Sequence, residues 1–589
     1  MIKATLSNIP VSETGTIRKK WKGRLPVALL YPNIYSLAIS NLGFQLVYSL
    51  INAQPDIVCE RFVYPDSDQP LRSLESNHPL TDFAIVCVSV SFEHDFPRLA
   101  GMLAAGGIAP MAADRASDIA PGSPLVIMGG VGVFMNPEPI APFTDLMVIG
   151  EAEAVLPELF LLLSRARKSG ADRDALLRQC GLVRGCYVPS LYSPTYGDDG
   201  RVERITAEPG LPERVERMTI TTTSCAAHSM QLSPAAELGM YMIELGRGCS
   251  RGCRFCAAGF IYRPPRLWTK EAILCALNER PAHVDKVGLL GMEMASSDTL
   301  DHIAATLQEQ QCALSFSSLR ADRISPQLIT LLADSGLKSV AIAPDGASER
   351  LRRIINKGLS EADLLDAATR LVEAGIVHLK LYVMIGLPTE TNEDFDELAR
   401  MLARMRKLLL PVARKQGRMV EITLSVNSFV PKPWTSFQYL SFGGLDRNTA
   451  LARKNSSAAL LALKQKIRYL RRMVNKLPNV RLKVDRPERV LEQAVFSRGD
   501  RRLAGVLLDM GIGKYSFKQA MKAHGLTSWE YAVRPREADE LMCWQVLDHG
   551  IKDGYLYREL ERAYRLQATS PCDTSRCRRC GICHGTLEA

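Results

Sequence analysis

From residue 27 to about residue 154, short apolar runs alternate with longer segments whose apolar residues recur at helical spacing. This alternation is typical of a parallel sheet covered by helices. A helix is expected over 40–51, with Ser40 as its N-cap. The predicted strands are 27–31, 58–63, 84–90, 125–128 and 146–149.

Small residues gather at the carboxyl ends of these predicted strands. In an open parallel sheet, ligands bind beyond those ends, and small side chains would let a large planar or phosphate-bearing ligand approach the backbone. Glycine at a strand end is also an ordinary turn residue, so the pattern is weak by itself. The candidate ligand-facing residues are Ser89, Ser91, Gly129, Gly130, Gly150 and Glu151.

A second alternation of strands and helices follows an irregular stretch that is rich in turn residues. Its repeated βα units imply a partial or full barrel, whose chemistry lies at the carboxyl ends of the strands. Beyond it the sequence turns mainly helical and basic, with a long helix expected near 449–477. The predicted strands are 242–245, 286–290, 314–318, 339–343, 379–385 and 421–426, and the helices between them include 270–280, 326–335 and 361–374.

Composition narrows the class of protein. A chain of 589 residues, of which 47% are hydrophobic and 23% charged, is large enough for several globular domains, and wholesale disorder is excluded. We find no apolar leader and no apolar stretch of the roughly 18 to 20 residues that a bilayer span needs. We therefore expect a cytoplasmic protein with no membrane partner.

Positive charge is concentrated in one segment. Between Arg400 and Arg502 there are 24 Lys and Arg but 6 Asp and Glu, a net charge of +18, whereas the whole chain carries +10. Two interpretations stay open: solvated helix faces, or a platform for RNA, whose phosphates would add affinity that salt removes.

Three cysteines form a compact motif after the strand predicted at 242–245. Cys249, Cys253 and Cys256 have the spacing C-x3-C-x2-C. Structural zinc takes four ligands, so three thiolates leave one metal position open. In a [4Fe-4S] cluster, one iron would then lack a protein ligand. Nearby arginines are expected to lower the pKa of these thiols: Arg247, Arg251, Arg254, Arg263 and Arg266.

Four further cysteines lie close together near residue 580. Their spacing is C-x4-C-x2-C-x2-C, which has the count and compactness of one metal site. Zinc would make a four-thiolate knuckle, whereas an iron-sulfur cluster would make an electron relay or a substrate anchor, and the spacing does not separate the two. A merely reduced tail is the third interpretation. These residues are Cys572, Cys577, Cys580 and Cys583.

The C-x3-C-x2-C motif, with Phe255 before its last cysteine, resembles the signature of the radical S-adenosylmethionine (radical SAM) superfamily. The resemblance implies a [4Fe-4S] cluster on Cys249, Cys253 and Cys256, whose open iron binds S-adenosylmethionine (SAM). It also implies reductive cleavage of SAM to methionine and a 5′-deoxyadenosyl radical, fed by an electron donor such as flavodoxin or ferredoxin. A zinc site or a purely structural site is the alternative.

Other residues resemble the SAM-binding positions of that superfamily. All of them lie at the carboxyl ends of predicted strands, where a barrel places its chemistry. The alternative for each is a capping or turn residue. They are Gly291, Glu293, Ser317, Arg320, Asp345, Ser348, Arg350 and Gly386.

The predicted N-terminal sheet resembles the cobalamin-binding module of the B12-dependent branch of the superfamily. Over most of the chain, segments such as Asn41-Leu42-Gly43 and Asn136-Pro137-Glu138-Pro139 resemble a bacterial family of that branch with no defined substrate. The Asp-x-His-x-x-Gly motif that supplies an axial histidine is absent, and His94 is expected to be a surface or hydrogen-bonding residue. Cobalamin bound without a histidine and a retained empty scaffold both stay open.

We therefore expect an α/β protein of five regions. They are a doubly wound, cobalamin-binding-like domain (1–165), a linker with short strands (166–240), a partial (β/α)6 TIM-type radical SAM barrel (241–435), a basic helical extension (436–565) and a cysteine-rich metal-binding tail (566–589).

The leading hypothesis for function is a radical SAM enzyme that carries out cobalamin-dependent methylation, or a related modification, of RNA or an RNA-associated protein. One alternative is cobalamin-independent modification of a small metabolite. Another is a non-catalytic iron-sulfur electron-transfer or metal-structural protein.

Overall fold

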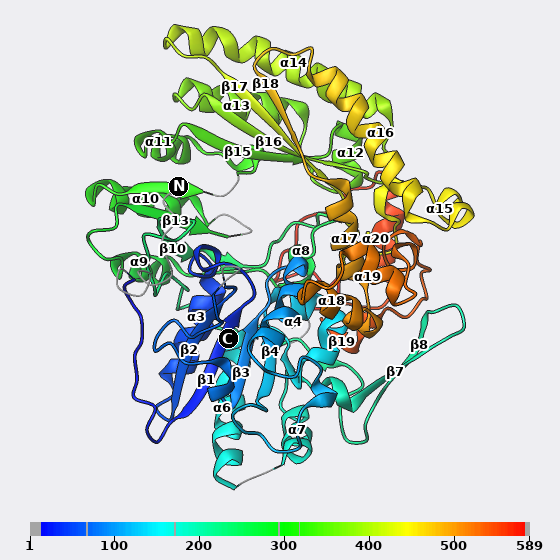
Figure 1. Cartoon of the computed structure of the whole chain (residues 1–589). Coiled ribbons are helices and arrows are strands. Elements are labelled where there is room, and N and C mark those ends of the chain that lie inside the picture. The colour runs from blue at the N-terminus through cyan, green and yellow to red at the C-terminus, as the bar shows by residue number, and fades with distance from the viewer. Residues whose placement is uncertain (1–12, 66–68, 170–171, 292–294, 317–318, 584–589) are drawn as a thin grey trace.

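The computed structural model describes residues 13–65, 69–169, 172–291, 295–316 and 319–583. It is an α/β structure in which an N-terminal sheet lies below two further parallel sheets in the view of Figure 1, with the C-terminal helices beside both. Among the described residues, no helix has the length and apolar character needed to cross a membrane.

The N-terminal sheet has six strands in the order β2-β1-β3-β4-β5-β6. Its first five strands are parallel, and β6 pairs antiparallel with β5. Most strand residues are buried, as expected for a sheet that is covered on both faces. The strands are β1 (Leu25–Tyr31), β2 (Ile57–Val63), β3 (Ile85–Ser89), β4 (Leu125–Gly129), β5 (Leu146–Val148) and β6 (Cys186–Tyr187); the helices are α2 (Tyr35–Ala38), α3 (Leu42–Ala53), α4 (Phe96–Ala105), α5 (Val131–Met135), α6 (Ala152–Ser169) and α7 (Arg173–Gly181).

The helix expected over 40–51 begins later than its apolar pattern indicates. Asn41, not Ser40, is the N-cap of α3, because the Asn41 side chain accepts a hydrogen bond from the Phe44 N–H at 2.9 Å. The Ser40 hydroxyl instead donates to the Ser36 carbonyl at 2.8 Å. Both residues are good caps, and the tertiary contacts of Ser40 decide between them.

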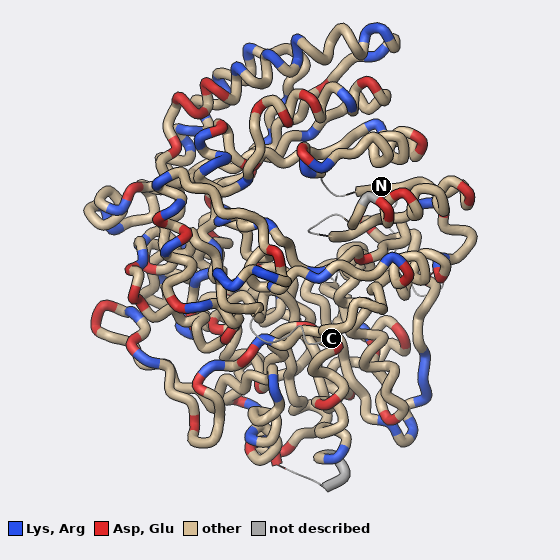
Figure 2. The backbone as a smooth tube through the Cα atoms, turned by 180° about the vertical axis from the view of Figure 1, so that it is seen from behind, with Lys and Arg blue, Asp and Glu red and all other residues tan. Residues whose placement is uncertain are grey.

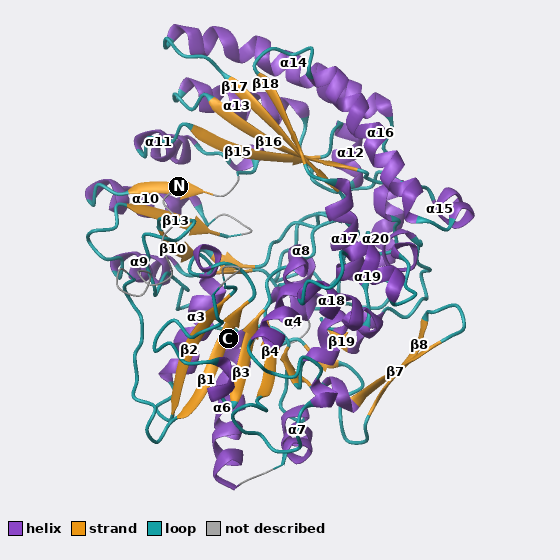
Figure 3. Ribbon diagram, in the orientation of Figure 1, coloured by secondary structure: helices purple, strands orange, loops and turns teal. Residues whose placement is uncertain are grey.

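Seven further parallel strands form two sheets, β10-β13-β14 and β15-β16-β17-β18 (Figure 3). An isolated parallel bridge between Leu319 and Ile342 lies between them. All six strands predicted in this region are present, and the basic segment adds β18, which pairs with β17. The strands are β10 (Tyr241–Glu244), β13 (Lys286–Leu290), β14 (Ala313–Phe316), β15 (Ser339–Asp345), β16 (His378–Ile385), β17 (Glu421–Ser428) and β18 (Val480–Val484); the helices are α8 (Ala258–Ile261), α9 (Lys270–Asn278), α10 (Ser297–Glu309), α11 (Pro326–Asp334), α12 (Glu349–Ile354), α13 (Glu361–Glu373) and α14 (Asn392–Lys415).

The long helical segment expected near 449–477 is present but is divided into two helices. α15 (Arg447–Arg453) ends at Lys454, whose φ of 42° is left-handed. α16 (Ser456–Val474) then starts afresh on Asn455, whose side chain accepts a hydrogen bond from the Ala458 N–H at 3.1 Å. A left-handed residue followed by an N-cap ends one helix and begins another within two positions.

The C-terminal helices attach directly to the N-terminal sheet. α18 packs on α4 so closely that a Cβ added at Gly511 would lie 2.1 Å from the Pro97 carbonyl oxygen, and one at Gly101 would lie 2.3 Å from that of Gly511. The remaining elements are β7 (Tyr192–Tyr196), β8 (Val202–Ala207), β9 (Val215–Glu216), β11 (Gly246–Arg247), β12 (Arg266–Leu267), α17 (Pro487–Arg498), α18 (Ala504–Gly511), α19 (Phe517–Ala523), β19 (Leu547–Asp548) and α20 (Tyr555–Tyr564).

Candidate functional site

A cavity of about 400 Å³, here called the N-terminal cavity, opens at the carboxyl ends of β3, β4 and β5. It reaches down between α3 and the sheet as far as Leu29, Ile51 and Cys87. Its volume is in the range of small-molecule sites, about 300 to 1,000 Å³. All the residues predicted to face a ligand at this edge line it: Ser89, Ser91, Gly129, Gly130, Gly150 and Glu151.

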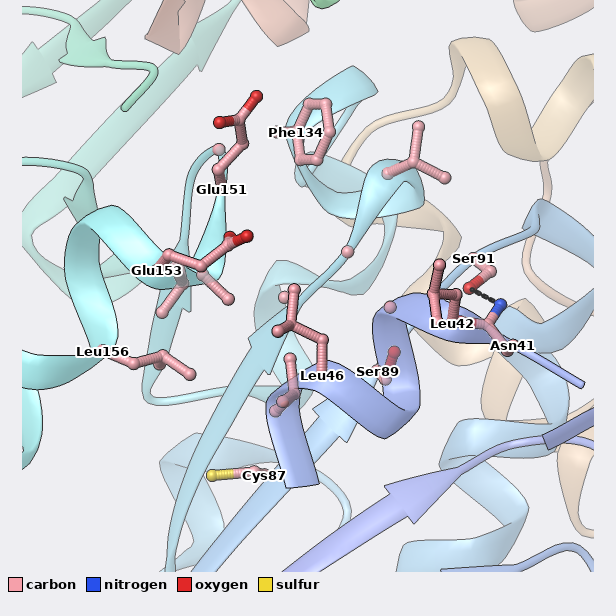
Figure 4. A pocket seen from close by; sticks show the side chains of 18 of the residues that line it. Asn41, Leu42, Leu46, Cys87, Ser89, Ser91, Phe134, Glu151, Glu153 and Leu156 are labelled. Atoms are coloured by element: carbon pink, nitrogen blue, oxygen red, sulfur yellow. Dashed lines mark hydrogen bonds between the residues drawn. The ribbon is translucent and has the colours of Figure 1, made fainter. Parts of the chain in front are cut away.

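Polar groups sit on opposite sides of this cavity. Figure 4 shows Asn41 and Ser91 on one side, joined by a hydrogen bond of 3.3 Å, and Glu151 and Glu153 on the other. His94 is absent from the lining residues, and its Nε2 lies 3.0 Å from the Arg489 carbonyl oxygen, as expected for a hydrogen-bonding residue.

Two of the predicted glycines are required by the backbone. Gly130 and Gly150 have φ values of 105° and 116°, and added Cβ atoms would lie 2.6 Å from the Val90 oxygen and 2.1 Å from the Met218 oxygen. At Gly129 the nearest atom to an added Cβ is 3.7 Å away, so there is space for a side chain. Gly129 is therefore the position at which a larger residue would fill cavity space without backbone strain.

The far wall of the N-terminal cavity comes from the second half of the chain. Glu244 ends β10, Arg247 lies in β11, and Tyr262 follows α8. Arg247 forms ion pairs with Glu153 at 2.8 Å and Glu244 at 3.0 Å. This network was not predicted from the sequence, because its members lie on α6, β10 and β11, which are far apart in the chain.

Glu151, which follows β5 of the N-terminal sheet, forms ion pairs with two arginines of the β11–β12 sheet. It pairs with Arg266 at 2.6 Å and with Arg247 at 3.4 Å. Burial disfavours its charged form, but the hydrogen bond and charge of Arg266, with the charge of Arg247, lower the pKa of Glu151 overall. A charged, buried carboxylate thus faces the cavity between the two halves of the protein.

The segment from Cys249 to Cys256, here called the cysteine loop, follows β11 and leads into α8. The Cys256 N–H donates to the Cys253 carbonyl at 3.1 Å. Burial, and then the neighbouring Cys253 and Cys249, raise the pKa of the Cys256 thiol to about 12, and burial also raises the pKa of Cys253. Arg251, one of the arginines expected to lower these pKa values, does lower the pKa of Cys253, but burial outweighs its charge and the net shift is upward.

Arg254 illustrates where those arginines are used. Its side chain is fully buried inside the cysteine loop. It pairs with Glu559 of α20 at 3.3 Å and donates to the carbonyls of Ile354 at 3.0 Å and Gln567 at 2.6 Å. Arg254 thus ties the cysteine loop to α12 and to the C-terminal end of α20, instead of compensating thiolate charge.

Two of the predicted SAM-binding residues lie near the cysteine loop. Asp345, at the end of β15, forms an ion pair with Lys357 at 2.6 Å, and Arg320 donates to the Lys357 carbonyl at 2.6 Å. The charges of Lys357, Asp345 and Arg320 all act on the Cys253 thiol. Lys357 was missed in the sequence, because it follows a short helix and belongs to no motif.

The other predicted SAM-binding residues are of three kinds. Some form contacts within the fold, one is exposed, and two lie outside the residues that the structure describes. Ser348 caps α12, accepting from the Leu351 N–H at 3.1 Å. Arg350 pairs with Asp394 at 2.5 Å, and the Gly386 N–H donates to the Glu390 carboxylate at 2.7 Å. The Ser348 contact is a helix cap and the Gly386 contact lies within a turn, whereas Arg350 forms an ion pair with a residue of α14. Gly291 is exposed just after β13, whereas Glu293 and Ser317 lie outside the described residues.

The C-terminal cysteines, here called the terminal cysteines, lie against the cysteine loop. The Cys572 N–H donates to the Ser250 carbonyl at 2.6 Å. Cys572, Cys577 and Cys580 line one small cavity together with Arg263. Burial, and then the other terminal cysteines, raise the pKa of Cys572 to about 12. No spacing rule in the sequence predicts this proximity.

Neither cysteine set is drawn together at ligand distance. In the part of the chain that the structure describes, no group of three or more His, Cys, Asp or Glu side chains is arranged to hold a metal ion. The thiols within each set nevertheless lie close enough to raise one another's pKa. Sulfur donors of this number suit iron-sulfur clusters or zinc.

Two family models match the chain. The model described as radical SAM proteins, N-terminal, matches residues 43–189, and the radical SAM superfamily model matches residues 243–402. The first match contains most of the N-terminal cavity, and the second contains the cysteine loop.

The chain is similar to several known proteins at low sequence identity. An uncharacterized protein of Methanocaldococcus jannaschii, MJ0966, is 27% identical over 489 residues, which cover 82% of this chain and 90% of that protein. An uncharacterized methyltransferase of Pyrococcus horikoshii, PH0819, is 22% identical over 290 residues, covering 48% of this chain and 58% of that protein. The solved structure of the cobalamin-dependent SAM radical enzyme OxsB, with aqua-cobalamin and SAM bound, has a TM-score of 0.48 and 13% identity, covering 92% of this chain and 80% of that one.

Proposed function

We propose, from the premise that this chain belongs to the radical SAM superfamily, that Cys249, Cys253 and Cys256 hold the [4Fe-4S] cluster of a radical SAM enzyme. When bound, the cluster and SAM supply reductive cleavage of a carbon–sulfur bond, driven by an electron donor such as flavodoxin or ferredoxin. The three thiols share one loop, and Asp345, Lys357 and Arg320 provide charged groups near it. These groups support a site for a zwitterionic cofactor such as SAM.

The N-terminal cavity supports cobalamin as a second cofactor. The cavity combines an opening at the strand ends with a slot that runs between α3 and the sheet, which suits a ligand with a broad head and a long tail. Its lining contains no histidine, so cobalamin would bind without a histidine ligand from these residues. When bound, cobalamin supplies methyl transfer.

One observation carries the combined proposal. Residues of the cobalamin-binding-like sheet and residues that flank the cysteine loop line the same cavity: Gly129, Glu151, Glu244, Arg247 and Tyr262. Glu151 and Arg247 hold the two walls together through a buried ion pair. We propose that substrate reacts in this shared space, where the N-terminal sheet faces the partial (β/α)6 barrel to which the parallel strands from β10 to β17 would belong.

We further propose RNA, or a protein bound to RNA, as the substrate. Lys and Arg recur along α14 (Figure 2). Exposed cations continue on α16, in the turn after it and on β18, at Arg468, Arg471, Lys476 and Lys483. A basic surface of this kind gives affinity for polyanions.

The decisive experiment is anaerobic purification, followed by iron, sulfide, zinc and cobalt analysis and by an assay of 5′-deoxyadenosine from SAM under reduction. We expect iron, sulfide, bound corrinoid and 5′-deoxyadenosine. Iron without 5′-deoxyadenosine would favour an electron-transfer protein. Activity without corrinoid and without RNA affinity would favour modification of a small metabolite.

We propose a second metal site at the terminal cysteines, on the support of their contact with the cysteine loop. Substitution of Cys577 by Ala is expected to lower the metal content while 5′-deoxyadenosine production from the first cluster is measured separately. If the metal lost in this variant is zinc, the site is a structural knuckle, whereas a loss of iron and sulfide would identify an electron relay. Unchanged metal content in this variant would contradict the site.

A further inference from the structure

A small cavity of about 30 Å³ lies between the β7–β8 hairpin, the end of α17 and the segment 529–543. Its volume exceeds the roughly 10 to 15 Å³ that one water needs. It therefore suits a compact ligand and no larger molecule. Its wall contains five arginines, namely Arg201, Arg498, Arg502, Arg534 and Arg536.

Three carboxylates form ion pairs with four of these arginines but not with the fifth. Asp199 pairs with Arg201 at 3.0 Å, and Asp500 pairs with Arg502 at 2.7 Å. Glu540 serves Arg534 at 2.5 Å and Arg536 at 2.8 Å. Glu530, the other carboxylate of the wall, accepts a hydrogen bond from the Thr527 N–H at 3.3 Å.

Arg498 is the arginine without a carboxylate partner in the described part of the chain. Its side chain donates to the carbonyls of Leu440 at 2.8 Å and Ala532 at 3.1 Å. Its residue is 1% exposed, and arginine keeps its charge even when buried. Burial and the charges of Arg536 and Arg534 disfavour this cation, and the charge of Glu540 offsets them only in part, so the pKa of Arg498 is lowered.

Several hydrogen-bond donors around the cavity also lack partners. Among the described residues these are Nε and Nη2 of Arg498, Nε of Arg536 and the hydroxyl of Tyr531, all of them buried. All three side chains line the cavity. Buried polar groups are normally satisfied, so four free donors around one space require an acceptor.

Cys543 does not supply that negative charge. Its thiol lines the same cavity, but burial raises its pKa well above the ordinary value. The thiol stays neutral and donates to the Gly499 carbonyl at 3.1 Å. The cavity thus has an excess of donors and of positive charge.

We propose that this cavity binds a free tetrahedral oxyanion, phosphate or sulfate, through Arg498, Arg536 and Tyr531. Charge-assisted hydrogen bonds from several directions suit an oxyanion. The anion would also brace the N-terminal cavity, because Asn136, just after α5, donates to the carbonyls of Ser497 at 3.1 Å and Gly499 at 2.8 Å. It would therefore act as a structural ligand that fixes the end of α17 against α5.

The test is titration of the full-length protein with inorganic phosphate and with sulfate, in chloride buffer at constant ionic strength, by calorimetry and thermal unfolding. We expect saturable binding and a saturable rise in Tm. Arg498→Met should abolish both, and Tyr531→Phe should weaken binding about tenfold. The matched control is Arg468→Met, which removes an exposed arginine of α16 and should bind as the unsubstituted protein does.

Three results would overturn the proposal. One is no saturable binding by the unsubstituted protein. Another is an equal rise in Tm with anion for the unsubstituted protein and for Tyr531→Phe, because salts also stabilise proteins non-specifically. This comparison decides the question even if Arg498→Met does not fold. The third is binding of adenosine monophosphate as tightly as phosphate, which would show an open phosphoryl site instead of an enclosed one.

Discussion

The Cys572 N–H donates a hydrogen bond of 2.6 Å to the Ser250 carbonyl, so the terminal cysteines dock on the cysteine loop. Asn356 strengthens this docking, because its side-chain amide donates to the carbonyls of Gly252 at 3.1 Å and Thr569 at 3.0 Å. The two sulfur-rich segments are therefore neighbours in space, although most of the second half of the chain separates them in sequence.

Arg254→Met should release this docking. Removal of the guanidinium takes the buried cation away from Glu559 and leaves it the half-exposed Arg562, 3.6 Å away; breaking a buried ion pair costs up to about 3 to 5 kcal/mol. We expect a loss of this size in the free energy of unfolding, measured by denaturant titration, and faster proteolysis of the segment after α20.

The matched comparison uses Glu559→Gln and the double variant. The double variant should recover part of the loss, because neither charge is then left alone. Arg562→Met removes a half-exposed arginine that lies 3.6 Å from the same carboxylate, and should cost less than about 1 kcal/mol. Equal losses for Arg254→Met and Arg562→Met would show that Arg254 does not hold the segment.

Glu540 gives the protein a pH-dependent stability. Burial opposes its charge, but the hydrogen bond from Arg534 and the charges of Arg536 and Arg534 lower its pKa to about 2. A pKa lower in the folded than in the unfolded state stabilises the fold above the unfolded value of about 4.5, and this stabilisation is lost as pH falls toward 2. The free energy of unfolding should therefore drop by about 3 kcal/mol across this range.

Glu540→Gln should flatten that part of the profile. The variant is expected to be less stable at pH 6 and to approach the unsubstituted protein near pH 2. Denaturant titration between pH 6 and 2 measures both. Parallel profiles for the two proteins would contradict the assignment to Glu540.

Cys253→Ala should abolish 5′-deoxyadenosine production by the reduced, reconstituted protein. Only two of the three proposed ligands, Cys249 and Cys256, would then remain to hold the cluster. The iron assigned to this cluster should fall with it. Cys275→Ala is the matched control, since this thiol is exposed on α9 and belongs to neither cysteine set. Retained production in Cys253→Ala would exclude it as a ligand.

Gly129→Leu should block the N-terminal cavity while the fold survives. The added Cβ has 3.7 Å of clearance, and the rest of the side chain would occupy ligand space. We expect loss of corrinoid absorbance after reconstitution with little change in Tm. Ala403→Leu, on the exposed face of α14, adds the same atoms away from the cavity and should keep normal corrinoid binding.

Substitution of Arg468, Arg471 and Lys476 by Gln should weaken RNA binding. If all three contact phosphates of a single strand, the slope of log affinity against log salt should become shallower by about two. Binding measured over a range of salt concentrations checks this.

The control for this experiment makes the same charge change on the other side of the protein. It replaces the exposed Arg178, Arg184 and Arg214 by Gln. We expect the salt slope of this variant to match that of the unsubstituted protein. Identical slopes for both triple variants would remove α16 from the proposed RNA surface.

Local patterns in the sequence predicted the strands well, because buried parallel strands form apolar runs with clear ends. β13 has the predicted bounds, 286–290. β18, in which exposed Arg481 and Lys483 alternate with half-buried apolar residues, was not predicted, because it is one short strand within a basic and mainly helical segment.

The candidate site was predictable only in part. The cysteine loop and the small residues at Ser89 and Gly129 follow from motifs and strand ends. The pairing of Arg247 with Glu153, the docking of Cys572 and the role of Arg254 depend on contacts between distant segments. Burial, which raises the pKa of Cys253, likewise belongs to the folded molecule and not to any short stretch of sequence.

The backbone contact between Gly101 and Gly511 bears on how this protein is made. α4 emerges from the ribosome long before α18, which later covers it. During synthesis, the face of α4 that later contacts α18 is therefore exposed to solvent. Transiently exposed apolar surface promotes aggregation. The N-terminal region completes its own packing only after α18 has been synthesised.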